Sequence, residues 1–257
     1  MSKSLTVLDL FSGIGGFSYA AERLVGGFQT VAFCDSDSAC RRVLRKHWPI
    51  TPIFEDVCTL QAKDIQPLCP DGLSLITAGF PCQDLSVAGK QAGYDGERSV
   101  LFYEIIRLAR ELRPDFLLLE NVRNLLSHKN GETFQETLFQ IAKAGYDAEW
   151  AVIPASDLGA CHRRERIWIV AYANHSGLQG QRPQCQLSES SGEGKASWRS
   201  GGPMLSPEWG GYISKPVLCR GDDGLRGRVD RLRQLGNSVV PQVAAVPLQR
   251  IKELAPA

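Results

Sequence analysis

Short apolar runs alternate with amphipathic stretches along most of the chain. The runs typical of buried strands cover residues 5–10, 28–34, 73–78, 115–120, 147–153 and 166–172. The stretches with helical periodicity cover residues 17–25, 37–46, 100–112 and 131–144, and a last apolar segment covers 239–254. This alternation predicts an α/β fold with a mostly parallel sheet and helices on both faces. Ligands of such sheets bind at the carboxyl ends of the strands, so residues that follow each strand are candidates for function.

Two segments interrupt this pattern. Residues 79–99 form a long loop that contains four glycines, and loops of this length within a compact domain are usually functional or disordered. Residues 174–201 are rich in serine, glycine and glutamine, which is typical of a flexible insert. The segment that follows differs in composition, because five arginines lie between residues 220 and 233.

Charge and cysteine content narrow the class of protein. The 257 residues include 29 Lys and Arg against 28 Asp and Glu, a formal net charge of +1, which excludes a strongly basic nucleic-acid coat and an acidic disordered chain. The longest apolar stretch, 167–173, is too short to span a membrane, and the first residues do not fit a signal peptide, so we expect a cytoplasmic protein. The eight cysteines contain no C-x-x-C pair, which predicts reduced thiols and no metal site.

A glycine-rich turn follows the first strand. Gly13, Gly15 and Gly16 allow backbone amides to approach a ligand closely, whereas Ser18 stands where a dinucleotide-binding motif requires glycine. This pattern favours a smaller nucleoside ligand that carries a carboxylate. Asp35 ends the second strand, where an acid can bind ribose hydroxyls. A structural turn beside a solvated acid remains the alternative interpretation.

Four further candidates lie at or near the ends of later strands. Cys82 comes after the strand at 73–78, so it is either a nucleophile or a buried apolar cysteine. Glu120 ends the strand at 115–120, where it is a candidate acid or hydrogen-bond acceptor or else a solvated strand-end carboxylate. Strand alternation predicts that Arg164 and Arg166 lie on one face, as part of a site or of a charged surface strand.

Taken together, these motifs resemble those of the DNA (cytosine-5)-methyltransferase family. The segments FSGIGG, GFPCQDLS, ENV, HRRER and RQLGNSVVPQ occur here in the order typical of that family. The resemblance implies a Rossmann-like S-adenosylmethionine-dependent methyltransferase fold with a small irregular recognition lobe. It also implies that double-stranded DNA is the partner, that no membrane is involved, and that the protein is a monomer. Three features depart from the family pattern. His162 stands where glutamine is usual, and the recognition region is unusually short. The motif that normally links this region to the last one is reduced to the stretch LRGRVDRLR.

The resemblance also implies roles for individual residues. Cys82 would attack carbon 6 of a flipped-out cytosine, Glu120 would hold ring nitrogen 3 and the exocyclic amine, and Arg166 with Arg164 would hold the 2-oxo group. The residues that would bind S-adenosylmethionine are Phe11, Gly13, Ile14, Gly15, Gly16, Asp35, Ser36, Asp56, Val57, Pro81, Asn237 and Ser238. The residues that would contact DNA are Gln83, Ser86, Arg226 and Arg228.

The same interpretation divides the chain into three parts. Residues 1–172 would form the catalytic and cofactor-binding domain, 173–230 a reduced target-recognition and linker region, and 231–257 a segment that packs back on the first domain. Within the middle part, we expect 205–233 to contact DNA and 176–200 to act mainly as a linker. Two other functions remain open at this point: an RNA cytosine-5-methyltransferase, and a catalytically silent protein that binds cofactor and DNA.

Overall fold

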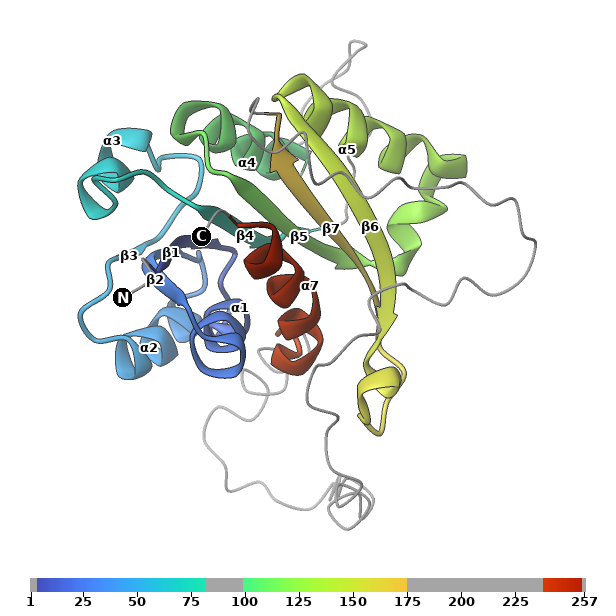
Figure 1. Ribbon diagram of the computed structural model, residues 1–257, viewed down its shortest axis with the longest axis horizontal. Coiled ribbons are helices and arrows are strands. Elements are labelled where there is room, and N and C mark those ends of the chain that lie inside the picture. Colours follow the sequence, from blue (N-terminus) through green and yellow to red (C-terminus); the bar gives the residue numbers. More distant parts are fainter. Residues whose placement is uncertain (1–3, 82–98, 175–237, 256–257) are drawn as a thin grey trace.

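The computed structural model describes residues 4–81, 99–174 and 238–255 (Figure 1). Six of the candidate residues lie outside these ranges: Cys82, Gln83, Ser86, Arg226, Arg228 and Asn237. The expected linker at 176–200 and the expected DNA-contacting segment at 205–233 also lie outside the described residues. The structure therefore tests the sheet, the helices and the part of the candidate site that these elements carry.

A seven-stranded sheet, in the order β3-β2-β1-β4-β5-β7-β6, forms the centre of the fold. Its strands are β1 (Leu5–Leu10), β2 (Phe28–Cys34), β3 (Ile53–Phe54), β4 (Leu75–Gly79), β5 (Phe116–Val122), β6 (Tyr146–Pro154) and β7 (Glu165–Ala173). The first five strands pair in parallel, and β7 runs antiparallel between β5 and β6. The predicted mostly parallel sheet is thus confirmed, and two-residue β3 is the one described strand that the apolar pattern did not predict.

Helices cover both faces of this sheet, as predicted. The helices are α1 (Gly16–Tyr19), η1 (Ala20–Val25), α2 (Ser38–His47), α3 (Ala62–Ile65), α4 (Ser99–Leu112), α5 (Glu132–Lys143) and α7 (Pro241–Leu254). Short 3-10 segments are η2 (Gln66–Leu68), η3 (Arg123–Leu126), η4 (His128–Gly131) and η5 (Ala155–Leu158). None of the helices in the described ranges is long and apolar enough to cross a membrane.

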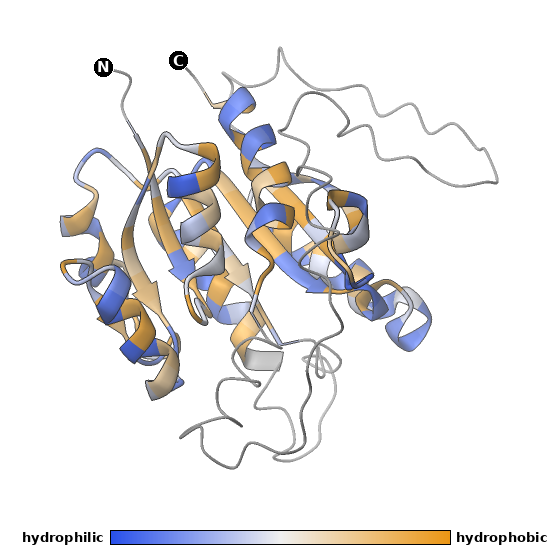
Figure 2. Cartoon of the chain, turned by 90° about the horizontal axis from the view of Figure 1, so that it is seen from below, coloured by the Kyte–Doolittle hydropathy of each residue, from blue (hydrophilic) through white to orange (hydrophobic). Residues whose placement is uncertain are grey.

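Alternate residues of the strands supply two separate cores. On one face, β-strand residues such as Leu8, Ile76 and Leu117 pack against α3, α4 and α5. On the other face, residues such as Val7 and Leu118 pack against α1, η1 and α7. Figure 2 shows largely hydrophobic strands covered by helices in which hydrophobic and hydrophilic residues alternate. The carboxyl-terminal helix α7 lies against α1 and η1, so the end of the described chain returns to its beginning (Figure 1).

Candidate active site

The candidate residues gather at the edge of the sheet where the parallel strands end. The chain leaves β1, β2, β4 and β5 at this edge, and antiparallel β7 begins there, since Val122 at the end of β5 pairs with Arg166. Residues far apart in sequence therefore meet because of topology alone. The sequence predicts that the candidate residues lie just after the strands, at one edge of the sheet. The described candidates do lie at this edge.

An ion pair between Glu120 and Arg166 lies at this edge. The Arg166 Nε atom donates to Glu120 Oε1 at 2.9 Å, and the two side chains are 23% and 13% exposed. Gly79 is the cross-strand neighbour of Glu120, and a Cβ atom at Gly79 would lie 3.3 Å from Glu120 Oε2. The small residue therefore leaves room for the carboxylate beside the chain segment that leads toward Cys82.

Burial and the arginines act on the pKa of Glu120 in opposite directions. Burial raises this pKa, the positive charges of Arg166 and Arg164 lower it, and burial prevails, so the net shift is upward. A carboxyl group with a raised pKa that keeps a cationic partner can share a proton with a ring nitrogen. Such a group can stabilise charge that develops in a heterocycle during reaction.

Arg164 also lies at this site, but strand alternation does not account for its position. The prediction that alternation along a strand aligns Arg164 with Arg166 is wrong, because β7 begins at Glu165 and Arg164 has a φ of +30°. The Arg164 guanidinium instead donates from Nη2 to the carbonyl of Ser238 at 2.8 Å. Arg164 thereby joins the residues before α7 to the Glu120 site.

Asn121 fixes the backbone just before the position of Cys82. Its Nδ2 atom donates to the carbonyl of Phe80 at 3.0 Å, and its Oδ1 atom accepts from the backbone N–H of Val122 at 2.8 Å. Asn121 is 3% exposed, and its bond to Phe80 is sheltered from water. The end of β5 and the Phe80–Pro81 segment are thus held together by a side chain adjacent to Glu120.

The turn after β1 forms a second part of the site. Phe11 has a φ of +52°, a strained conformation for a residue with a side chain, and Ser12 is tied to β2 through hydrogen bonds with Cys34. The N–H of Gly13 donates to Asp35 Oδ2 at 2.7 Å, and the N–H of Asp37 donates to Oδ1 at 2.8 Å. Burial raises the pKa of Asp35 although these two backbone bonds lower it. The carboxylate is oriented while each oxygen retains a free acceptor position.

The three glycines of this turn have different surroundings. A Cβ atom at Gly13 would meet nothing within 4 Å, so this position faces open space. At Gly15 a Cβ atom would lie 2.6 Å from the ring of Trp48, and at Gly16 it would lie 2.8 Å from the carbonyl of Val239. Gly15 and Gly16 are therefore required for packing, while Gly13 leaves space for a ligand.

The remaining described candidates lie around the same edge. Ile14 and Pro81 are partly buried, Ser36 and Asp56 are exposed, and Val57 is buried. The Asp56 carboxylate accepts from the backbone N–H of Cys58 at 2.9 Å, which shapes the loop after β3. The structure thus brings the predicted residues after β1, β2, β3 and β4 to the edge that also holds Glu120.

Comparison with known proteins shows the family to which the chain belongs. The model of C-5 cytosine-specific DNA methylases matches residues 5–197, more than half of the chain. The chain belongs to this family. The resemblance that the five motifs indicate is therefore confirmed.

Individual relatives agree with this assignment. The type II methyltransferase M.DsaV of Dactylococcopsis salina is 35% identical over 173 residues, which are 66% of this chain and 46% of that protein. M.HhaI of Haemophilus parahaemolyticus, also a type II methyltransferase, is 34% identical over 175 residues, 68% of this chain and 51% of that protein. The chain thus spans about half the length of the curated relatives it matches. The crystal structure of the Schizosaccharomyces pombe Dnmt2 methyltransferase shares the fold, with a TM-score of 0.55, 23% identity, and coverage of 68% of this chain and 51% of that one.

Two polar residues near the site were not identified from the sequence as parts of it. Asp9 is fully buried in β1, where its carboxyl accepts from Ser18 Oγ at 2.7 Å and from Thr77 Oγ1 at 2.9 Å. Burial raises its pKa to about 7, although the hydrogen bonds oppose that shift. Arg41 of α2 donates to the carbonyls of Asp35 and Ser36 at 3.0 and 2.7 Å. An acid inside an apolar strand was a visible signal for Asp9, whereas nothing in the sequence distinguished Arg41 from other helix arginines.

Proposed function

We propose that this chain transfers a methyl group from S-adenosylmethionine to carbon 5 of cytosine in double-stranded DNA. The observation that carries the proposal is the partly buried Glu120–Arg166 ion pair, which lies beside the segment leading to Cys82 in a member of the C-5 methylase family. This pair offers a carboxyl group and a guanidinium, which match the ring nitrogen, amine and 2-oxo group of cytosine. The type II methyltransferases among its relatives support the same substrate.

The turn after β1 fits S-adenosylmethionine. Asp35 presents an oriented carboxylate for ribose hydroxyls, Gly13 leaves open space beside it, and the ring of Phe11 lies at the start of the same turn. When bound, the cofactor supplies an electrophilic methyl group on a sulfonium centre. We assign the cofactor site to Phe11, Gly13, Ile14, Gly15, Gly16, Asp35, Ser36, Asp56, Val57, Pro81, Asn237 and Ser238.

The chemistry follows from the poor nucleophilicity of carbon 5. The thiolate of Cys82 adds to carbon 6, and the electrons of the 5,6 double bond make carbon 5 nucleophilic enough to accept the methyl group. Glu120 shares a proton with ring nitrogen 3 and accepts from the exocyclic amine, while Arg166 and Arg164 hold the 2-oxo group. A base then takes the proton from carbon 5, the bond from carbon 6 to sulfur breaks, and the thiolate and aromatic ring are restored.

The target base has to leave the duplex before Cys82 can reach it. We assign DNA contacts to Gln83 and Ser86 in the loop after β4, and to Arg226 and Arg228. In this proposal residues 1–172 carry catalysis and cofactor binding, 173–230 form a short recognition and linker region, and 231–257 pack back on the catalytic domain. The contacts of α7 with η1 support the last assignment.

A methyl-transfer assay with three substrates tests this proposal. The full chain is incubated with S-adenosylmethionine labelled in its methyl group and with duplex DNA, the same duplex containing 5-fluorocytosine, or transfer RNA. We expect label in 5-methylcytosine of the normal duplex and a covalent complex with the fluorinated one, because fluorine blocks the final proton removal. Label in RNA alone would identify an RNA methyltransferase, and cofactor binding without transfer would identify a silent binding protein.

A further inference from the structure

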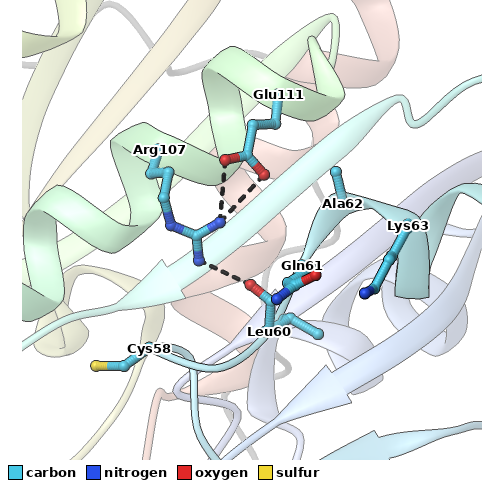
Figure 3. Close-up of a pocket in the computed structure, with 7 residues that line it drawn as sticks. All are labelled: Cys58, Leu60, Gln61, Ala62, Lys63, Arg107 and Glu111. Atoms are coloured by element: carbon cyan, nitrogen blue, oxygen red, sulfur yellow. Dashed lines mark hydrogen bonds and ion pairs between the residues drawn. The ribbon is translucent and has the colours of Figure 1, made fainter.

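All three guanidinium nitrogens of Arg107, on α4, donate hydrogen bonds within the protein. Its Nε atom donates to Glu104 at 2.6 Å, and Nη1 donates to both carboxylate oxygens of Glu111 at 3.2 and 3.1 Å. Its Nη2 atom donates to the carbonyls of Val57 at 3.3 Å and Leu60 at 2.7 Å. The five N–H groups of an arginine are thereby matched to five acceptors. Figure 3 shows Arg107 between Glu111 and Leu60, at the wall of a pocket of about 450 Å³.

The two carbonyls belong to the loop between β3 and α3. Within this loop the carbonyl of Asp56 accepts from the N–H of Leu60 at 3.1 Å, and the Asp56 carboxylate accepts from the N–H of Cys58. The side chains of Val57 and Leu60 are buried in the core. These local bonds shape the turn, and Arg107 ties its backbone to α4 by hydrogen bonds across about 50 positions of sequence.

The two glutamates fix the direction in which Arg107 points. Glu104 and Glu111 lie one turn before and one turn after Arg107 on α4, so both carboxylates flank the guanidinium. The hydrogen bonds and charges of these acids raise the pKa of Arg107, although partial burial lowers it. Lysine would keep the charge but could not present the same planar set of donors to two carboxylates and two carbonyls.

We propose that Arg107 is a positioning residue for recognition of the adenine base of the cofactor. This inference rests on the proposed function, in which Asp56 and Val57 belong to the cofactor site. The family resemblance implies that these two residues meet the edge of the adenine base. By holding the Val57 and Leu60 carbonyls, Arg107 fixes the backbone of the loop before the ligand arrives, so less ordering accompanies binding. Arg107 therefore contributes to the affinity for the adenine end of the ligand and does not alter the reacting cysteine or its partners.

Calorimetric binding of two ligands tests the proposal on the full chain. The ligands are S-adenosylhomocysteine and S-inosylhomocysteine, which differ in that hypoxanthine replaces adenine, removing the exocyclic amine. The variants are Arg107→Ala, Arg107→Lys and, as a matched control on the same helix, the exposed Arg110→Ala. We expect Arg107→Ala to weaken the adenosyl ligand about tenfold and the inosyl ligand by less than about threefold, because loosening the loop removes preorganised contacts to the amine.

The other outcomes are equally informative. Arg107→Lys should give a smaller loss with the same preference, which keeps the test valid if the alanine variant does not fold, and Arg110→Ala should bind both ligands as the unaltered chain does. If neither Arg107 variant changed the ratio of the two ligand affinities, whether both ligands bound more weakly or both bound as before, the proposal would be overturned. If the unaltered chain bound neither ligand, the proposed cofactor itself would be wrong, a failure distinct from that of Arg107.

Discussion

Replacing Glu120 by glutamine removes the charge of this side chain and keeps its shape nearly unchanged. The Arg166 Nε–H can still donate to the amide oxygen over a distance similar to the present 2.9 Å, so the site should keep its geometry. What disappears is a negative charge that is only 13% exposed and therefore weakly screened by water. Loss of one such oriented group typically costs about 10²–10³ in turnover, or about 2.7–4 kcal/mol in the barrier. DNA affinity should change little, because the interaction strengthens only as charge develops in the ring.

Single-turnover methyl transfer and equilibrium DNA binding separate these two effects. The matched control is Glu149→Gln, which alters a carboxylate that pairs with Arg250 through the same Nε and Oε1 atoms, at 3.3 Å, on β6. We expect the single-turnover rate of Glu120→Gln to fall and that of Glu149→Gln to remain unchanged. A collapse of DNA affinity in Glu120→Gln, or an unchanged rate, would show that Glu120 serves binding or folding and not the chemical step.

Three further variants probe the structure around this pair. Asp9→Asn should flatten the pH dependence of stability. The pKa of Asp9 is about 7 in the folded chain and near 3.8 in the unfolded chain, so between these pH values only the folded chain keeps the proton. The contribution of Asp9 to the free energy of unfolding therefore falls by about 1.4 kcal/mol per pH unit as the pH rises through this range. Urea denaturation from pH 5 to 8 measures it, and an unchanged slope would contradict the raised pKa. Asn121→Ala should leave the Phe80 carbonyl without its partner, destabilise the fold by about 1–3 kcal/mol and slow methyl transfer; unchanged stability and rate would contradict this role of the amide. Asp35→Ala should weaken S-adenosylmethionine about tenfold by calorimetry, since an oriented charged acceptor is lost, and unchanged affinity would remove Asp35 from the cofactor site.

Much of the fold could be predicted from the sequence because its strands are strongly apolar. The buried parallel strands predicted at residues 5–10 and 115–120 are mostly apolar, and the structure has β1 and β5 there within two residues. The candidate residues that follow them could also be predicted, since topology alone brings strand ends to one edge. Two-residue β3 could not, because its position depends on pairing with β2 and not on a local pattern.

Residues that act through long-range backbone contacts could not be found in this way. Arg107 lies on a helix whose apolar periodicity explains only its buried face, and its partners Val57 and Leu60 become neighbours only after folding. The family resemblance implies a role for Arg164 at the site, but strand alternation does not explain its place, which depends on a positive φ and on the carbonyl of Ser238. In each case the tertiary arrangement, and not the local sequence, determines which acceptor the guanidinium meets.

Bisulfite sequencing of DNA from cells that express the chain tests the central proposal most directly, because 5-methylcytosine resists conversion. The cells to compare express the unaltered chain, Cys82→Ala, or no added protein, in a host without cytosine-5 methylation of its own. We expect protected cytosines within one recurrent sequence context in cells with the unaltered chain, and complete conversion in the other two. Protection that persists with Cys82→Ala, or complete conversion with an unaltered chain that is shown to be folded and expressed, would contradict methyl transfer to cytosine through Cys82.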